Sequence, residues 1–152
     1  TTRGIKSQEP LRVVFTRTLN LPANSKLWDT NLSNTLVIYD GSKANEKYLK
    51  RIPKSVEIVK VKSDNPKLVS NILAQKGCNK ILWECGPKLA TSAIKSNCIQ
   101  ECITFVAPKI LGGDDCMTPF SDFKFTSMSE VVNLNIKEIN LFDDDICITS
   151  NL

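Results

Sequence analysis

The segment from Glu84 to Pro87 combines residue types that can position an anionic ligand. Glu84 directly follows three apolar residues, and Cys85 and Gly86 lead to Pro87 and a run with helical spacing. Glycine lets a ligand approach the backbone closely, and proline suits the first position of a helix. A helix N-terminus favours an anion such as phosphate, so three backbone N–H groups are expected to face it, those of Lys88, Leu89 and Ala90. A tight strand-to-helix turn with a solvated Glu84 fits the same residues equally well.

The absence of histidine narrows the chemistry that this chain can perform. None of its 152 residues is a histidine, which excludes Ser-His-Asp and Cys-His machinery. Any catalysis must therefore use carboxylates, Lys, Arg, Tyr, Cys, backbone groups or a cofactor. The six cysteines form no C-x-x-C pair, so we expect reduced thiols and no metal site.

The charge distribution points away from large anionic partners. A formal net charge of +4 suits a small anionic ligand, and the densest basic region, 43–67, is interpreted as a solvated face. No apolar run approaches the roughly 20 residues of a membrane span, and the sequence begins without a signal-peptide pattern. We therefore expect a cytoplasmic protein with no nucleic-acid and no membrane partner.

Alternating elements are expected to position the segment 84–87. Apolar β-branched runs predict strands at 11–15, 35–40, 56–61, 80–83 and 101–108. Helices are predicted from Ser42 to about Arg51, from Pro66 to before Gly77, and from Pro87 onward. The alternation on both sides of residues 143–145 predicts an antiparallel strand pair. These elements predict one α/β domain over residues 1–152, with a mostly parallel sheet flanked by helices. In such sheets ligands bind beyond the carboxyl ends of the strands, where Glu84 is expected.

Two motifs resemble the reductase domain of the bifunctional riboflavin biosynthesis deaminase/reductase. That family has an apolar strand, then Glu, two small residues and Pro, then a Leu- and Ala-rich helix, matched here by 81–94. A strand ending in Ala-Pro-Lys and an Ile/Leu-Leu-Gly-Gly loop follow, matched by 107–113. The segment 11–22 is also similar to the family pattern, so the resemblance covers nearly all of the chain. It implies a dihydrofolate-reductase-like fold whose first strand, helix and second strand precede "TTRG" in the family and are lacking here.

The resemblance also implies a reaction. The family uses NADPH to reduce 5-amino-6-(5-phosphoribosylamino)uracil to 5-amino-6-(5-phosphoribitylamino)uracil, with hydride transfer to ribose C1′. The cofactor carries this chemistry, so no catalytic side chain is assigned. The implied partners are the phosphorylated pyrimidine substrate, a second copy in a homodimer, and a zinc-deaminase domain upstream in the full-length protein. The chain alone is expected to have little or no activity.

Site residues follow from the motif positions. The resemblance implies that Glu84 and Arg3 bind the substrate, Arg3 through its phosphate. It places the cofactor phosphates on Gly86, Pro87, Lys88, Leu89, Ala90, Thr91 and Ser92. Arg17 matches a cofactor-contacting position and is a candidate for binding the 2′-phosphate of NADPH. Arg3 as an unbound terminal residue and Arg17 as a solvated loop cation are the alternatives. Cys85 departs from the Gly or Ala that is usual in the family.

Two alternatives keep the fold and change the function. The chain could be a non-catalytic structural or dimer-forming remnant of the domain, because the missing strands would have lined the site. It could equally be a different pteridine or nucleotide reductase on the same scaffold. A zinc-deaminase signature upstream in the reading frame would favour the riboflavin pathway.

Overall fold

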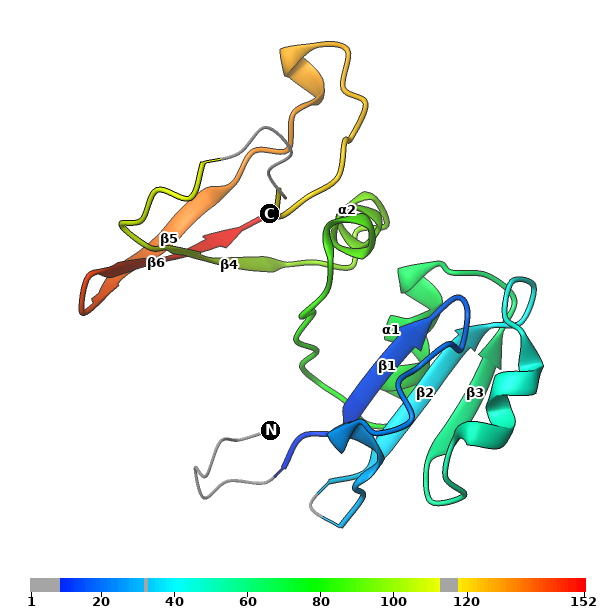
Figure 1. Ribbon diagram of the computed structural model, residues 1–152. Helices are drawn as coiled ribbons and strands as arrows, with labels where there is room; N and C mark the ends of the chain where they lie inside the picture. The colour runs from blue at the N-terminus through cyan, green and yellow to red at the C-terminus, as the bar shows by residue number, and fades with distance from the viewer. Residues whose placement is uncertain (1–8, 32, 113–117) are drawn as a thin grey trace. The chain divides into compact units, whose positions relative to one another are not determined.

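The computed structural model describes residues 9–31, 33–112 and 118–152 and confirms the α/β class (Figure 1). The chain divides into two compact units, residues 1–64 and 65–152, each with its own sheet. The single domain over 1–152 therefore stays a prediction. No helix in the described ranges is long and apolar enough to cross a membrane.

The first unit contains a parallel sheet in the order β1-β2-β3, made of β1 (Arg12–Thr16), β2 (Thr35–Asp40) and β3 (Glu57–Val61). All three strands were predicted from their apolar β-branched runs. Every residue of β2 is buried, as a central parallel strand requires. The register pairs Thr16 with Tyr39 and Asp40 with Val61, so the carboxyl ends of the strands lie at one edge.

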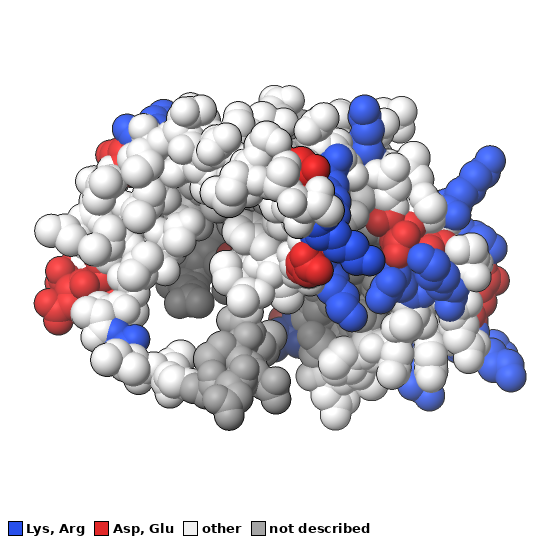
Figure 2. Space-filling view, turned by 90° about the horizontal axis from the view of Figure 1, so that it is seen from above, with Lys and Arg blue, Asp and Glu red and all other residues white. Residues whose placement is uncertain are grey.

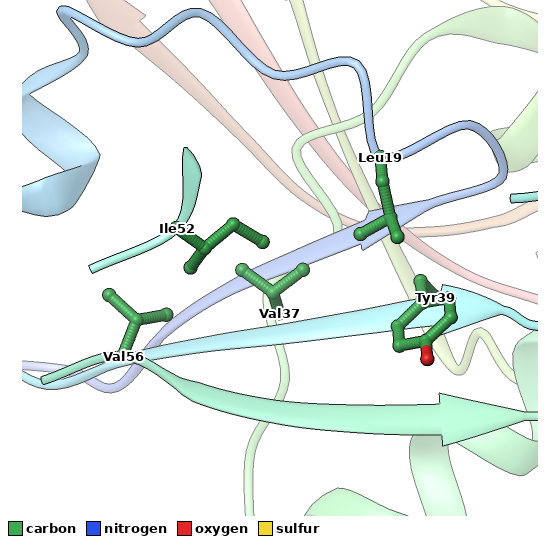
Figure 3. Close-up of a cluster of buried hydrophobic side chains, with 5 residues drawn as sticks. All are labelled: Leu19, Val37, Tyr39, Ile52 and Val56. Atoms are coloured by element: carbon green, nitrogen blue, oxygen red, sulfur yellow. The ribbon is translucent and has the colours of Figure 1, made fainter. Parts of the chain in front are cut away.

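A hydrophobic core covers one face of this sheet. Figure 3 shows its five buried side chains, those of Leu19, Val37, Tyr39, Ile52 and Val56. Val37 and Tyr39 alternate along β2 and therefore point to the same side. Leu19 has a φ of 59°, a left-handed conformation that costs a residue with a Cβ about 1–2 kcal/mol. Its burial in the core offsets that strain and fixes the loop after β1.

The helix predicted from Ser42 to Arg51 is shorter than expected. The structure has a 3₁₀ helix, η2 (Glu46–Arg51), whose cap is Asn45. Ser42 does not cap it, because the Ser42 N–H and hydroxyl donate to Asp40 Oδ1 at 2.9 and 2.6 Å. A local side-chain bond thus replaces the first turn of the expected helix. A further 3₁₀ helix, η1 (Lys26–Trp28), lies between β1 and β2.

The second unit begins with two helices, α1 (Pro66–Gln75) and α2 (Pro87–Lys95), both as predicted. Asn65 caps α1 by accepting the N–H of Lys67 at 2.9 Å. Gly77 follows α1 with a φ of 83°, a left-handed conformation that favours glycine after a helix.

An antiparallel sheet in the order β4-β6-β5 completes the second unit. It consists of β4 (Glu101–Val106), β5 (Asn135–Phe142) and β6 (Asp145–Asn151), with η3 (Met128–Glu130) before β5. The predicted antiparallel C-terminal pair is confirmed, and Asp143 with a φ of 53° lies at its turn. β4 also pairs with β6, which widens the pair to three strands.

The prediction of a strand at residues 80–83 is wrong. This segment has no regular structure, and Leu82 is 74% exposed. A strand exists only when another strand accepts and donates its ladder of hydrogen bonds. Within the described ranges no strand pairs with this segment, so its apolar run stays unassigned to a sheet.

Candidate functional site

The N-terminus of α2 presents an open glycine. Gly86 is the N-cap, with φ −71° and ψ 168°, and Pro87 is the first helical residue, as predicted. Apart from its chain neighbours, no atom of the described residues lies within 4 Å of a Cβ built on Gly86, and its φ is one that any residue adopts. Neither strain nor crowding within the described ranges requires glycine here. A ligand that approaches the backbone closely would still account for a glycine at this position.

Only part of the expected N–H cradle is available. The Leu89 and Ala90 N–H groups both donate to the Gly86 carbonyl at 3.1 Å, so their prediction as free donors is wrong. The first turn closes on its own cap, as helix ends often do. In the part of the chain that the structure describes, the Lys88 N–H has no backbone partner and stays available to an anion.

Glu84 and Cys85 precede this helix and differ in exposure. Glu84 is exposed, and no described residue hydrogen-bonds to its carboxylate or forms an ion pair with it. Cys85 is half-buried, and burial raises the pKa of its thiol. The Cys85 thiol therefore stays protonated at neutral pH and is a poor nucleophile. Glu84 is the group at this junction that can accept hydrogen bonds from a ligand.

Thr91 has a structural partner that the sequence did not indicate. Its buried hydroxyl donates to the Ser121 carbonyl at 3.2 Å and accepts the Ser121 N–H at 2.9 Å. Lys95, one turn later, donates to the Phe123 carbonyl at 3.0 Å and lies 5.5 Å from the centre of the Phe123 ring. One side of α2 is thus fixed to residues 121–123. The partners are about thirty residues apart, and no local pattern links them.

Charged side chains meet where the three parallel strands of the first unit end. We call Arg17, Asp40, Ser42, Lys43 and Asp64 the carboxyl-edge cluster. Lys43 Nζ lies 2.9 Å from Asp64 Oδ2 and 3.6 Å from Asp40 Oδ2. An Arg17 guanidinium nitrogen lies 3.5 Å from the same Asp64 oxygen.

The pKa shifts in this cluster follow from its hydrogen bonds. The hydrogen bond with Lys43 lowers the pKa of Asp64 and raises the pKa of Lys43. The hydrogen bond from Ser42 lowers the pKa of Asp40, so both carboxylates are charged at neutral pH. On the face that Figure 2 displays, most Lys and Arg side chains gather on one side of the view with Asp and Glu among them.

The sequence pointed to Arg17 but not to the other members of this cluster. A signal was present, because Asp40 ends β2 and Asp64 follows β3 closely, at the strand ends where ligands bind in parallel sheets. The prediction instead used that rule only for Glu84.

A comparison with known protein families shows to which of them this chain belongs. The model of the RibD C-terminal domain matches residues 1–148. The chain belongs to this family. RibD of Synechocystis is 37% identical over 135 residues, which cover 88% of this chain and 36% of that protein. The chloroplastic riboflavin biosynthesis protein PYRR of Zea mays is 35% identical over 134 residues, covering 88% of this chain and 22% of the relative.

Solved structures of RibD proteins share the fold. A deaminase/5-amino-6-(5-phosphoribosylamino)uracil reductase from Thermotoga maritima gives a TM-score of 0.80 at 16% identity, over 99% of this chain and 40% of that one. A structure of Acinetobacter baumannii RibD gives 0.74 at 20% identity, over 92% and 37%. The expected fold is therefore confirmed, and the chain spans well under half of each of these proteins.

Within this family the predicted site residues fall into separate groups. Glu84 and 86–92 lie together in the second unit, at the start of α2. Arg17 lies in the first unit with Lys43 and Asp64. Arg3 lies outside the described residues, as do Gly113 of the second motif and Cys116.

Proposed function

We propose that this chain is the reductase part of a riboflavin biosynthesis enzyme. In the full protein it would use NADPH to reduce 5-amino-6-(5-phosphoribosylamino)uracil to 5-amino-6-(5-phosphoribitylamino)uracil. The family match over residues 1–148 is the observation that carries this proposal. The Thermotoga neighbour is described as that uracil reductase, which supports the choice of substrate.

The residues at the start of α2 fit a phosphate of a dinucleotide. Gly86 leaves space beside the backbone, the Lys88 N–H is available, and the helix dipole favours negative charge at this end. Bound NADPH supplies the hydride for the reduction. Gly86 and Lys88 would hold it in place through its phosphate.

Glu84 would position the substrate beside that phosphate. An exposed carboxylate with no partner among the described residues can accept hydrogen bonds from ribityl hydroxyls or pyrimidine N–H groups. Its place directly before α2 would hold the two ligands side by side, which hydride transfer requires.

The wider assembly belongs to the same proposal. The relatives extend far beyond the matched region, which supports a further domain in the full protein, and we propose the zinc deaminase in that role. We also propose a homodimer and a cytoplasmic location. The five cysteines that the structure describes are all free thiols, which suits a reducing compartment.

A substrate comparison with the full protein tests the proposed function. NADPH oxidation is measured with the ribosylaminouracil substrate, with dihydrofolate and with a dihydropteridine, and the product is identified by mass. We expect turnover with the uracil and a product heavier by two hydrogens. Turnover of a pteridine alone would assign a different reductase, and NADPH binding without any turnover would favour a non-catalytic remnant.

A further inference from the structure

We propose that Lys43 is a second phosphate-binding cation beside Arg17, and that Asp64 holds both cations until the 2′-phosphate of NADPH displaces it. This inference rests on the proposed function, because it assigns the cofactor specificity of the same enzyme. Its basis is the carboxyl-edge cluster, at the end of a parallel sheet where ligands of α/β proteins bind.

The backbone beside Arg17 is fixed while its side chain is open. The Thr16 hydroxyl accepts the N–H groups of Thr18 and Leu19 at 3.3 and 3.2 Å. Leu19 is fully buried in the core of the first unit. The Arg17 side chain is nevertheless 57% exposed. Because the backbone is already ordered, binding of a ligand has to order only the Arg17 side chain.

A buried carboxylate fixes the position of Lys43. Asp40 is fully buried, and Ser42 occupies its Oδ1. Asp40 Oδ2 has no hydrogen-bond partner in the described residues, and the Lys43 ammonium lies 3.6 Å from it. The charge of Asp40 therefore attracts Lys43 to the strand edge, while about half of the lysine side chain, 49%, stays exposed. A lysine without such an anchor would be an ordinary solvated cation.

Asp64 already occupies the place that an anion would take. One of its oxygens, Oδ2, lies 2.9 Å from Lys43 Nζ and 3.5 Å from Arg17. The aspartate is itself 36% exposed, and it carries one negative charge. A phosphomonoester carries about 1.5 to 2 negative charges at neutral pH and three acceptor oxygens. Such a group can bind both cations at once and is the stronger partner of the two.

Asp64 would then distinguish cofactors that carry a 2′-phosphate from those that do not. NADH has no 2′-phosphate, so it leaves the Asp64 ion pairs in place and gains nothing from Lys43 or Arg17. NADPH replaces these ion pairs with stronger ones. Removal of the Asp64 charge should therefore tighten the binding of a 2′-phosphate, although it removes two ion pairs from the protein.

Binding of two nucleotides to the full protein tests this arrangement. Isothermal titration calorimetry compares adenosine 2′,5′-bisphosphate with adenosine 5′-monophosphate, which lacks the 2′-phosphate. We expect Lys43→Gln to weaken binding of the bisphosphate by about tenfold, as loss of one charge-assisted hydrogen bond does. Lys43→Arg should retain most of it, Asp64→Asn should tighten it several-fold, and binding of the monophosphate should stay constant.

Lys60→Gln is the matched control. Lys60 also forms an ion pair in the first unit, with Glu46 Oε1 at 2.7 Å and similar exposure, but outside the carboxyl-edge cluster. It should leave the affinity for both nucleotides unchanged. Thermal unfolding of each variant shows whether a lost affinity comes from a lost fold.

The outcomes separate this inference from the proposed function. The inference is overturned if folded Lys43→Gln binds the bisphosphate as the parent does, if Asp64→Asn weakens binding, or if the bisphosphate does not bind. Reductase activity with any of these results leaves the proposed function intact. Bisphosphate binding that responds as expected, in a protein without uracil reductase activity, contradicts only the proposed function.

Discussion

Glu84 is the residue whose substitution distinguishes a ligand contact from a structural acid. In the full protein, Glu84→Gln should lower kcat/KM for the uracil substrate about ten- to hundredfold and leave the Kd of NADPH nearly unchanged. The reason is the loss of a hydrogen bond to a charged group, typically about 1.5–3 kcal/mol. Steady-state kinetics with both ligands varied gives these constants.

Glu138→Gln is the control for that substitution, because Glu138 is an exposed acid on β5. It should change neither constant. If Glu84→Gln lowers the melting temperature while kcat/KM stays at the parent value, Glu84 is a structural residue and the assignment is wrong.

Asp40 should make the first unit sensitive to acid. The hydrogen bond from Ser42 holds its pKa in the folded protein below the usual value of about 3.9. Its ionised form therefore stabilises the fold above that pH, and this contribution disappears as the pH falls through the folded pKa. Urea unfolding between pH 7 and pH 2 should show that Asp40→Asn is less stable at pH 7, with a gap that closes below about pH 4.

An exposed acid in the turn between β5 and β6 provides the comparison. Asp144→Asn should track the parent at every pH, since the structure gives this side chain no ion pair or hydrogen bond in the described residues. A gap between Asp40→Asn and the parent that stays constant down to pH 2 would show that ionisation of Asp40 is not the cause.

At the scale of elements, Thr91 ties α2 to the segment around Ser121. Thr91→Val keeps the shape of the side chain but removes two hydrogen bonds, and it leaves the Ser121 N–H with only its longer hydrogen bond to the Pro87 carbonyl at 3.3 Å. We expect the free energy of unfolding to fall by about 1–3 kcal/mol. Urea denaturation of the full protein measures it, and Thr91→Ser, which retains the hydroxyl, should lose less.

The same variant tests whether Thr91 binds the cofactor phosphates, as the family resemblance implies. If the hydroxyl serves the fold, NADPH affinity should stay close to that of the parent at temperatures where the variant is folded. Unchanged stability with weakened NADPH binding would instead show that Thr91 contacts the cofactor.

Most of the elements that could be predicted follow from patterns among residues that are close in the sequence. The continuous apolar run of β2 and the pattern of Pro66 and Gly77 around α1 depend on neighbouring residues, and both predictions are confirmed. The strand at 80–83 failed because a strand needs partners elsewhere in the chain. The contacts of Thr91 with Ser121, and of Lys43 with Asp64, bridge 30 and 21 residues and were invisible for the same reason.

At the scale of the whole molecule, the antiparallel sheet has an apolar face. The register places Val106, Ile146 and Leu141 in one row across β4, β6 and β5, and they are 46%, 37% and 73% exposed. Ile139 adds to the same side at 58%. In the same unit, a cavity of about 580 Å³ borders Leu82 and residues from α1 and β4. Contiguous apolar surface of this kind normally contacts other protein.

Residues 1–152 alone are therefore expected to have little or no reductase activity. The chain spans 36% of Synechocystis RibD, and the apolar row and the cavity beside Leu82 are surfaces that the remainder of a longer protein can cover. A ligand site whose supports are not fixed loses the precise placement that hydride transfer requires. The isolated chain should bind the hydrophobic dye ANS strongly and oxidise NADPH slowly with the uracil substrate. The full protein should bind little dye and turn over, whereas equal rates for the two would show that residues 1–152 contain a complete site.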